Sequence, residues 1–350
     1  MVNKIMRSIL IYIEKGLCCS MNIVQTLSSG KELLKLQREL SLLDALDIKG
    51  VRFNLCKFAF NDWEQVLSNI KKAISVYGER FELFLDVPYP QNKARIRKFS
   101  IKDGIIKKGE RYVIKIDSAE EERDNEITVE IDKFDERLKK GTVIYFGDGE
   151  GAFEIRDIQK GCLVVEAING FTIFENKGIT CGYVSNRTQC IKNIEKISWM
   201  FDRTVTILLS FLQTSEEIDY LKGNLNLSNI QIIPKIELIH DTKNLPELVS
   251  RSDGALLARG DMGLLNNVSD LLEICRVVSG QTSLEHKRLF AATDILSSYK
   301  YRSFPSRADL FDLCILHELG CTDIILSYPI SEHINEILNL VAKFQTNHLI

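Results

Sequence analysis

The stretch IQIIPKIE at residues 230–237 decides the fold class, because a short apolar run here ends in two charged side chains. Near-continuous apolar character over a few residues is typical of a strand buried on both faces, as in a parallel sheet. Lys235 and Glu237 are two positions apart, so on a strand both side chains point to the same face. Charged residues at the carboxyl end of a parallel strand are typical of a functional rim.

Similar apolar runs lie on both sides of this stretch, at 22–27, 50–55, 82–87, 204–210, 254–260, 288–293 and 322–327. The segments between the runs have helical periodicity, with predicted helices at 30–46, 62–77, 268–280, 307–320 and 331–344. Gly320 is the expected C-cap of the helix at 307–320. Eight strand–helix repeats predict an α/β fold, a (β/α)8 TIM barrel. A doubly wound open sheet is the alternative; the count of eight and the polar residues at the strand ends favour the barrel.

One segment of about 90 residues after the third strand has a different pattern. It contains short alternating strands at 111–117, 126–132, 142–148, 152–158 and 162–168. Turn signals such as Asp148-Gly149 separate these strands. We therefore predict a small all-β domain at 91–180, inserted as a β-barrel lid between barrel parts at 21–90 and 181–350. Residues 1–20 form an N-terminal extension.

Composition and charge exclude several classes of protein. The chain is 45% hydrophobic and 27% charged, with a formal net charge of −3, which argues against a general nucleic-acid binder. The N-terminal apolar run at 8–13 is shorter than most secretory signals, and no stretch approaches the roughly 18 apolar residues needed to span a membrane. The nine cysteines form no Cys-x-x-Cys pair. We expect a cytoplasmic protein with reduced cysteines and neither nucleic-acid nor membrane partners.

The predicted rim places a set of polar residues where a metal and an anionic substrate could bind. Glu237 and Asp261 follow neighbouring strands, and two carboxylates suit Mg²⁺ or Mn²⁺. Lys235 adds a positive charge suited to an enolate or a transferring phosphoryl group. Peptide N–H groups at Gly260 and Asp261 could hold a carboxylate, and Thr293 could donate a hydrogen bond or relay a proton. A purely structural Lys235–Glu237 ion pair is the alternative for that pair, but charges along a whole rim are costly without a use.

Several stretches together resemble the pyruvate kinase family over about residues 21–345. The most specific are IQIIPKIE (230–237) and SDGALLARGDMG (252–263), and weaker ones include VRFNLCKF (51–58), LFLDVPYP (83–90), YFGDGEGAFEI (145–155), FAATDILSS (290–298) and GCTDIILS (320–327). The resemblance implies that Lys235 neutralises the moving phosphoryl group and that Glu237 and Asp261 hold Mg²⁺. It also implies that Thr293 takes part in protonating the enolate.

The resemblance assigns the remaining rim residues to substrate and to a monovalent cation. Arg52 would bind phosphate, and the Gly260–Asp261 backbone would hold the substrate carboxylate. The region of the phosphate and of the monovalent cation would be lined by Asn54, Asp86 and Ser210.

The sequence departs from the family at segments that contribute to nucleotide and K⁺ binding. The family's Gly-Pro after the first strand is Ser28-Ser29 here, its Ser-His is Cys56-Lys57, and its Thr-Lys-Gly-Pro-Glu is the run at 87–91. A need for K⁺ is left open, with Lys57 or Lys93 as a substitute positive charge. Because the sequence ends after the eighth helix, we expect a divergent member that lacks the family's C-terminal regulatory domain.

Three functions follow from this combination. The first is a Mg²⁺-dependent phosphotransferase acting on phosphoenolpyruvate, pyruvate or a close analogue, with a nucleotide or another acceptor. The second keeps only the enolate half of the site and is a Mg²⁺-dependent lyase, aldolase or decarboxylase of a 2-oxo acid. The third is a non-catalytic binding descendant, against which the retained metal ligands count. The expected partner is a small 2-oxo acid or enol phosphate, and homo-oligomerisation is left open.

Overall fold

The computed structural model describes residues 21–347 apart from 29, 59–61, 90, 117–123, 186, 226 and 240. The predicted extension at 1–20, together with Ser29 and Pro90 of the departing segments, lies outside the described residues. Parallel strands close into a barrel in the spatial order β1-β18-β17-β16-β15-β14-β3-β2. Their bounds are β1 Asn22–Thr26, β2 Gly50–Asn54, β3 Glu82–Pro88, β14 Val205–Ser210, β15 Ile230–Ile236, β16 Gly254–Ala258, β17 Arg288–Ala292 and β18 Asp323–Leu326. The predicted TIM barrel is confirmed, and the alternative of an open sheet is wrong.

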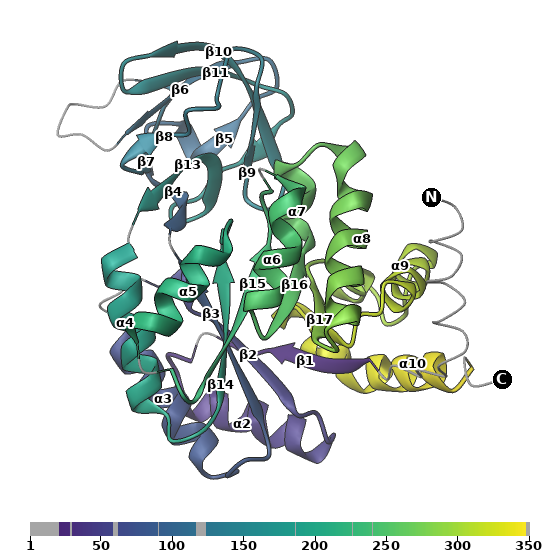
Figure 1. Ribbon diagram of the computed structural model, residues 1–350. Helices are drawn as coiled ribbons and strands as arrows, with labels where there is room; N and C mark the ends of the chain where they lie inside the picture. The colour runs from purple at the N-terminus through teal and green to yellow at the C-terminus, as the bar shows by residue number, and fades with distance from the viewer. Residues whose placement is uncertain are drawn as a thin grey trace, which may run out of the picture.

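Helices surround the barrel (Figure 1). They are α2 Leu33–Ala45, α3 Trp63–Ser75, α4 Arg187–Met200, α5 Ser215–Asn224, α6 Leu245–Arg251, α7 Arg259–Leu265, α8 Val268–Leu284, α9 Arg307–Glu318 and α10 Ile334–Asn347. Gly320 follows α9 with a φ of 73°, the left-handed conformation that ends many helices. Among the residues that the structure describes, none of the helices combines the length and the apolar character needed to cross a lipid bilayer.

The barrel has an apolar interior that ends in a polar layer. Phe84, Leu208 and Ile233 lie in the inner core. Two residues further along the same strands come Asp86, Ser210 and Lys235, which share the inward face because side chains alternate along a strand. A larger apolar core fills the space between the strands and the helices. The inner core therefore supports the polar side chains from below and fixes their height in the barrel.

The inserted domain follows β3 and has its own apolar core. Its strands are β4 Gln91–Phe99, β5 Ile105–Ile106, β6 Arg111–Ile116, β7 Glu126–Glu130, β8 Lys133–Phe134, β9 Val143–Phe146, β10 Gly151–Gln159, β11 Cys162–Ala167, β12 Phe171–Thr172 and β13 Gly178–Ser185. Pairing of β4 with β13 joins the two sides of the sheet into a small barrel. Figure 1 shows it beyond one end of the main barrel, with β9 close to α7. The predicted insertion after the third strand is confirmed.

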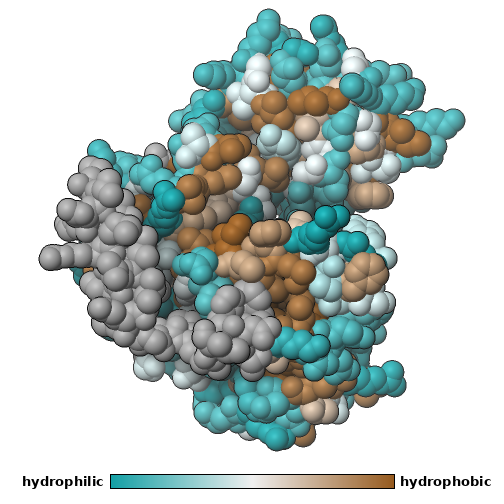
Figure 2. All heavy atoms as spheres, turned by 90° about the vertical axis from the view of Figure 1, so that its right-hand side faces the viewer, coloured by the Kyte–Doolittle hydropathy of each residue, from teal (hydrophilic) through white to brown (hydrophobic). Residues whose placement is uncertain are grey.

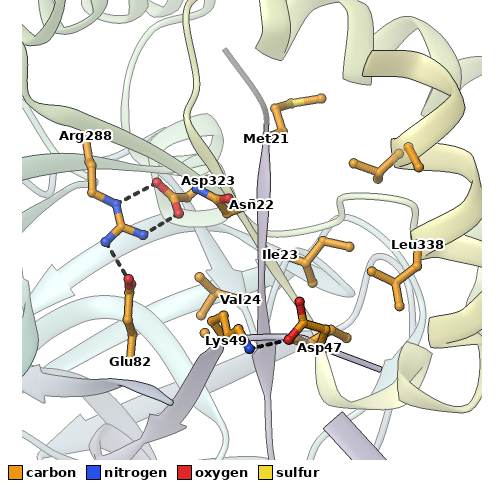
Figure 3. Close-up of a pocket in the computed structure, with 14 residues that line it drawn as sticks. Met21, Asn22, Ile23, Val24, Asp47, Lys49, Glu82, Arg288, Asp323 and Leu338 are labelled. Atoms are coloured by element: carbon orange, nitrogen blue, oxygen red, sulfur yellow. Dashed lines mark hydrogen bonds and ion pairs between the residues drawn. The ribbon is translucent and has the colours of Figure 1, made fainter. Parts of the chain in front are cut away.

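The opposite end of the barrel is tied together by Arg288 of β17 (Figure 3). Its guanidinium donates two hydrogen bonds to Asp323 of β18, at 2.9 and 2.5 Å, and a third at 2.8 Å to Glu82 of β3. The Asp323 side chain is fully buried. A pocket of about 330 Å³ lies here, and it is far from the carboxyl ends of the strands, where the barrel fold carries its chemistry.

Large apolar side chains also remain on the surface at the side of α8 and α9, which Figure 2 shows face-on. Phe311 and Ile315 of α9 are exposed, as is Leu272 of α8. They belong to none of the three apolar cores, which means that apolar area is left at the surface on this side of the barrel.

Candidate active site at the carboxyl ends of the barrel strands

Lys235 is the centre of the polar layer. Its Nζ atom lies 2.8 Å from Glu237 Oε1 and 3.2 Å from Asp86 Oδ1, and it donates a hydrogen bond of 3.1 Å to Ser210 Oγ. Only 13% of the Lys235 side chain is exposed. Burial alone would lower the pKa of this ammonium, but the two carboxylates outweigh burial and raise the pKa. Lys235 is therefore a fixed positive charge at neutral pH.

Arg52 adds a second cation on the other side of Asp86. Its guanidinium pairs with Asp86 Oδ2 and donates a hydrogen bond of 3.0 Å to Thr26 Oγ1. Burial would raise the pKa of Asp86, but Lys235 and Arg52 together lower it. Asp86 thus holds both cations in place while staying ionised.

Glu237 is held by the backbone as well as by Lys235. Its Oε2 atom accepts a hydrogen bond of 2.7 Å from the Phe211 N–H. Phe211 has a φ of 56°, which is uncommon for a bulky residue and marks a constrained position. Burial raises the pKa of Glu237; Lys235 opposes this, while the Asp261 carboxylate adds to it. An additional cation between the two carboxylates would relieve that repulsion.

Asp261 lies in α7, which begins directly after β16, and faces the inserted domain. Its Oδ1 atom accepts a hydrogen bond of 2.6 Å from Lys93 Nζ of β4. The same ammonium donates to the Gly147 carbonyl at 3.3 Å. Asp261 is therefore bound to the inserted domain through its ion pair with Lys93.

Thr293 lies against Gly260, the neighbour of Asp261. A Cβ atom added to Gly260 would come within 2.8 Å of Thr293 Cγ2 and 3.3 Å of Oγ1. Thr293 has a φ of 76°, and Arg259 holds it there by donating hydrogen bonds to the Thr293 carbonyl at 2.7 Å and to the Ala292 carbonyl at 3.3 Å. Only a glycine fits at 260 without moving this threonine.

Two pockets lie at this end of the barrel, and Arg52 and Asp86 line neither of these two. The first has a volume of about 200 Å³ and is lined from both domains by Asn54, Cys56, Lys57, Lys93, Arg95, Gly147, Asp148, Lys177, Gly178, Ser210, Phe211, Lys235, Glu237 and Asp261. The second, of about 560 Å³, is lined by Gly260 and Thr293 together with residues of α9. Phe211, Arg95 and Lys177 could not be predicted from the sequence, because a backbone donor and side chains from the insert carry no local sequence signal.

Asn54 and Asp86, expected near a monovalent cation, have partners within the protein. Asn54 Oδ1 accepts a hydrogen bond of 3.1 Å from the Cys56 N–H. Cys56 Sγ lies 3.6 Å from Asp86 Oδ1 and 3.7 Å from Ser210 Oγ. Burial of the sulfur, and then the Asp86 charge, raise the pKa of the Cys56 thiol. The thiol is therefore neutral and acts as a packing group.

The residues fit a hard divalent cation that takes further oxygens from its substrate. Glu237 and Asp261 line the same pocket, and two carboxylates with waters and substrate oxygens are a usual Mg²⁺ environment. Within the described part of the chain, His, Cys, Asp and Glu side chains nowhere gather in threes suited to a metal ion. Lys93 is hydrogen-bonded to Asp261, so a metal ion at both carboxylates would lie close to the positive charge of this lysine.

Comparison with known proteins identifies the family to which the chain belongs. The pyruvate kinase barrel-domain model matches residues 20–327. Pyruvate kinase of Sporosarcina psychrophila is 28% identical over 270 residues, which cover 75% of this chain and 45% of that protein. Pyruvate kinase of Methanocaldococcus jannaschii is 27% identical over 355 residues, which cover 95% of this chain and 71% of that protein. The chain spans about half the length of the first three curated relatives it matches, with 45%, 58% and 54% covered. Since the family model extends across nearly the whole barrel and its insert, the chain belongs to the pyruvate kinase barrel-domain family.

Proposed function

We propose that this protein is a Mg²⁺-dependent phosphotransferase that acts on phosphoenolpyruvate, pyruvate or a close analogue. The observation that carries the proposal is the Lys235 ammonium, held within 3.2 Å of Asp86, Glu237 and Ser210. Arg52 lies on the other side of Asp86. Two fixed cations at the end of a barrel suit a group whose negative charge is spread over several oxygens.

Each residue has a stated role in this proposal. Lys235 and Arg52 bind the phosphoryl oxygens and neutralise their charge during transfer. Glu237 and Asp261 would hold Mg²⁺, which when bound supplies positive charge to the substrate oxygens. The Thr293 hydroxyl, beside Gly260, is assigned to moving a proton to or from C3 of the enolate. Arg259 positions Thr293 through its two backbone hydrogen bonds.

The phosphoryl acceptor is left broader than ADP. The run at 87–91, which begins at the end of β3, replaces the family run that contributes to nucleotide binding, and its Tyr89 is buried. The Tyr89 hydroxyl donates a hydrogen bond of 2.5 Å to Glu217 Oε2 of α5. This side chain therefore supports packing of the barrel wall and offers nothing to a nucleotide.

The inward position of Tyr89 also favours a second candidate function. A site that keeps the enolate residues without a nucleotide segment suits a Mg²⁺-dependent lyase, aldolase or decarboxylase of a 2-oxo acid. The two candidates differ in whether phosphate leaves phosphoenolpyruvate for an acceptor.

The test follows phosphoenolpyruvate by ³¹P nuclear magnetic resonance, with Mg²⁺ and with ADP or another nucleoside diphosphate as acceptor. We expect transfer of phosphate to the acceptor. Lys235→Met should reduce the transfer rate by roughly 100-fold or more, because it removes a donor aimed at developing charge. Mn²⁺ binding should change less than the rate. Lack of any transfer, with 2-oxo acids still converted, would favour the second candidate; transfer that survives Lys235→Met would refute the role given to Lys235.

A further inference from the structure

Lys93 reaches from the inserted domain into the site of the barrel. It lies in β4, and its Nζ atom has an acceptor on each side: Asp261 Oδ1 at 2.6 Å in the barrel and the Gly147 carbonyl at 3.3 Å in the insert. Its side chain is only 13% exposed. An ammonium held between two oxygens and largely shielded from water is strongly localised, because charge-assisted hydrogen bonds are short and strong.

This ammonium binds one of the two carboxylates that are assigned to Mg²⁺. Glu237 is paired with Lys235 at 2.8 Å, and Asp261 is paired with Lys93 at 2.6 Å. An ammonium bound to a carboxylate opposes a metal ion at the same carboxylate, because two cations at short distance repel each other. Besides Glu237, Lys235 is held by Asp86 and Ser210 of the barrel, whereas Lys93 belongs to a different domain and is the cation that can be withdrawn.

The other charges around the pocket also oppose the binding of a divalent cation. The side chains that line it include more basic than acidic groups: Lys57, Lys93, Arg95, Lys177 and Lys235 against Asp148, Glu237 and Asp261. A divalent cation that enters alone therefore meets an excess of positive charge, and like charges at short distance repel. Removal of the lysine nearest to Asp261 would lower that repulsion and free the oxygen at once.

We propose that Lys93 is an internal cation that competes with the divalent metal ion for Asp261 and so sets the metal affinity of the site. This inference rests on the metal site of the proposed function. Metal binding and the ion pair between insert and barrel oppose one another. The Lys93 charge consequently lowers the affinity of the free protein for divalent ions, and an ion that binds Asp261 weakens this contact of the insert.

The test measures Mn²⁺ binding to the full chain without substrate, by the electron paramagnetic resonance signal of free Mn²⁺. Lys93→Met keeps the alkyl stem and removes the charge, and Lys93→Gln is a second variant in case the first does not fold. We expect both to bind Mn²⁺ on the order of tenfold tighter or more than the unchanged protein, since a charged hydrogen bond no longer opposes binding.

Lys177→Met is the matched control. It removes the same charge from the same pocket, but Lys177 pairs with Glu150 at 2.7 Å and not with Asp261. Its Mn²⁺ affinity should change much less than that of Lys93→Met. Asp261→Asn combined with Lys93→Met should lose the gain. Equal affinity of Lys93→Met and the unchanged protein, an equal gain in Lys177→Met, or a gain that survives Asp261→Asn would each overturn the proposal. Because no substrate is present, these results are independent of whether phosphoryl transfer occurs.

Discussion

Gly260 and Thr293 fit together so closely that a single methyl group should disturb them. Gly260→Ala places a Cβ atom 2.8 Å from Thr293 Cγ2, and Arg259 limits how far Thr293 can retreat. We predict that this change slows conversion of phosphoenolpyruvate or exchange at C3 of pyruvate by roughly 10- to 100-fold, since small misplacements of a reacting group are costly. Thermal unfolding should shift little.

Thr293→Ser in the same chain supplies the control, because it removes the Cγ2 methyl group and keeps the hydroxyl. The double variant Gly260→Ala/Thr293→Ser should recover part of the rate relative to Gly260→Ala alone. If Gly260→Ala is as active as the unchanged protein, or if the serine gives no recovery, the contact does not position Thr293 for the reaction.

At the scale of elements, substitutions at the two ends of the barrel strands should have different effects. Those at the amino end should change the free energy of unfolding, and those at the carboxyl end should change the reaction rate. Arg288→Met leaves the buried Asp323 carboxylate without its guanidinium partner. We expect urea unfolding to show a loss of about 2–4 kcal/mol, below the upper range for buried pairs because Arg288 is itself partly exposed. The rate of C3 exchange per folded molecule should stay the same, because Arg288 lies at the far end of the barrel.

Glu82→Gln tests the same cluster from its exposed side. Its side chain is 53% exposed, so loss of the charge should cost less than about 1 kcal/mol. A loss as large as that of Arg288→Met would mean that burial of Asp323 is not the cause of the effect.

The elements also show where sequence patterns suffice. Barrel strands such as β15 are apolar runs bounded by polar residues, and the stretch predicted at 230–237 contains the whole of β15 and one further residue. Strands β4 and β13 were not predicted. The sequence of β4, QNKARIRKF, is rich in charge, and β13 contains two glycines. Their pairing with each other fixes them as strands, and such tertiary context often overrides propensity.

At the scale of the whole molecule, the site is shared between a barrel and its insert. Positions such as Lys235 and Glu237 could be predicted because strand periodicity and the barrel rim specify them locally. The partner of Asp261 could not be predicted in this way, because Lys93 is 168 positions away in the chain. The contact depends on how the insert lies on the rim of the barrel. The sequence placed Lys93 among substitutes for K⁺, whereas its contact is with a residue assigned to Mg²⁺.

The enolate chemistry of the rim is the central claim, and exchange of the C3 protons of pyruvate in D₂O tests it most directly. Proton magnetic resonance with Mg²⁺ present should show loss of the methyl signal faster than without protein. Glu237→Gln should abolish the acceleration, and Glu82→Gln, the same substitution at the opposite end of the barrel, should retain it. No acceleration by the unchanged protein, or acceleration that survives Glu237→Gln, would contradict the account.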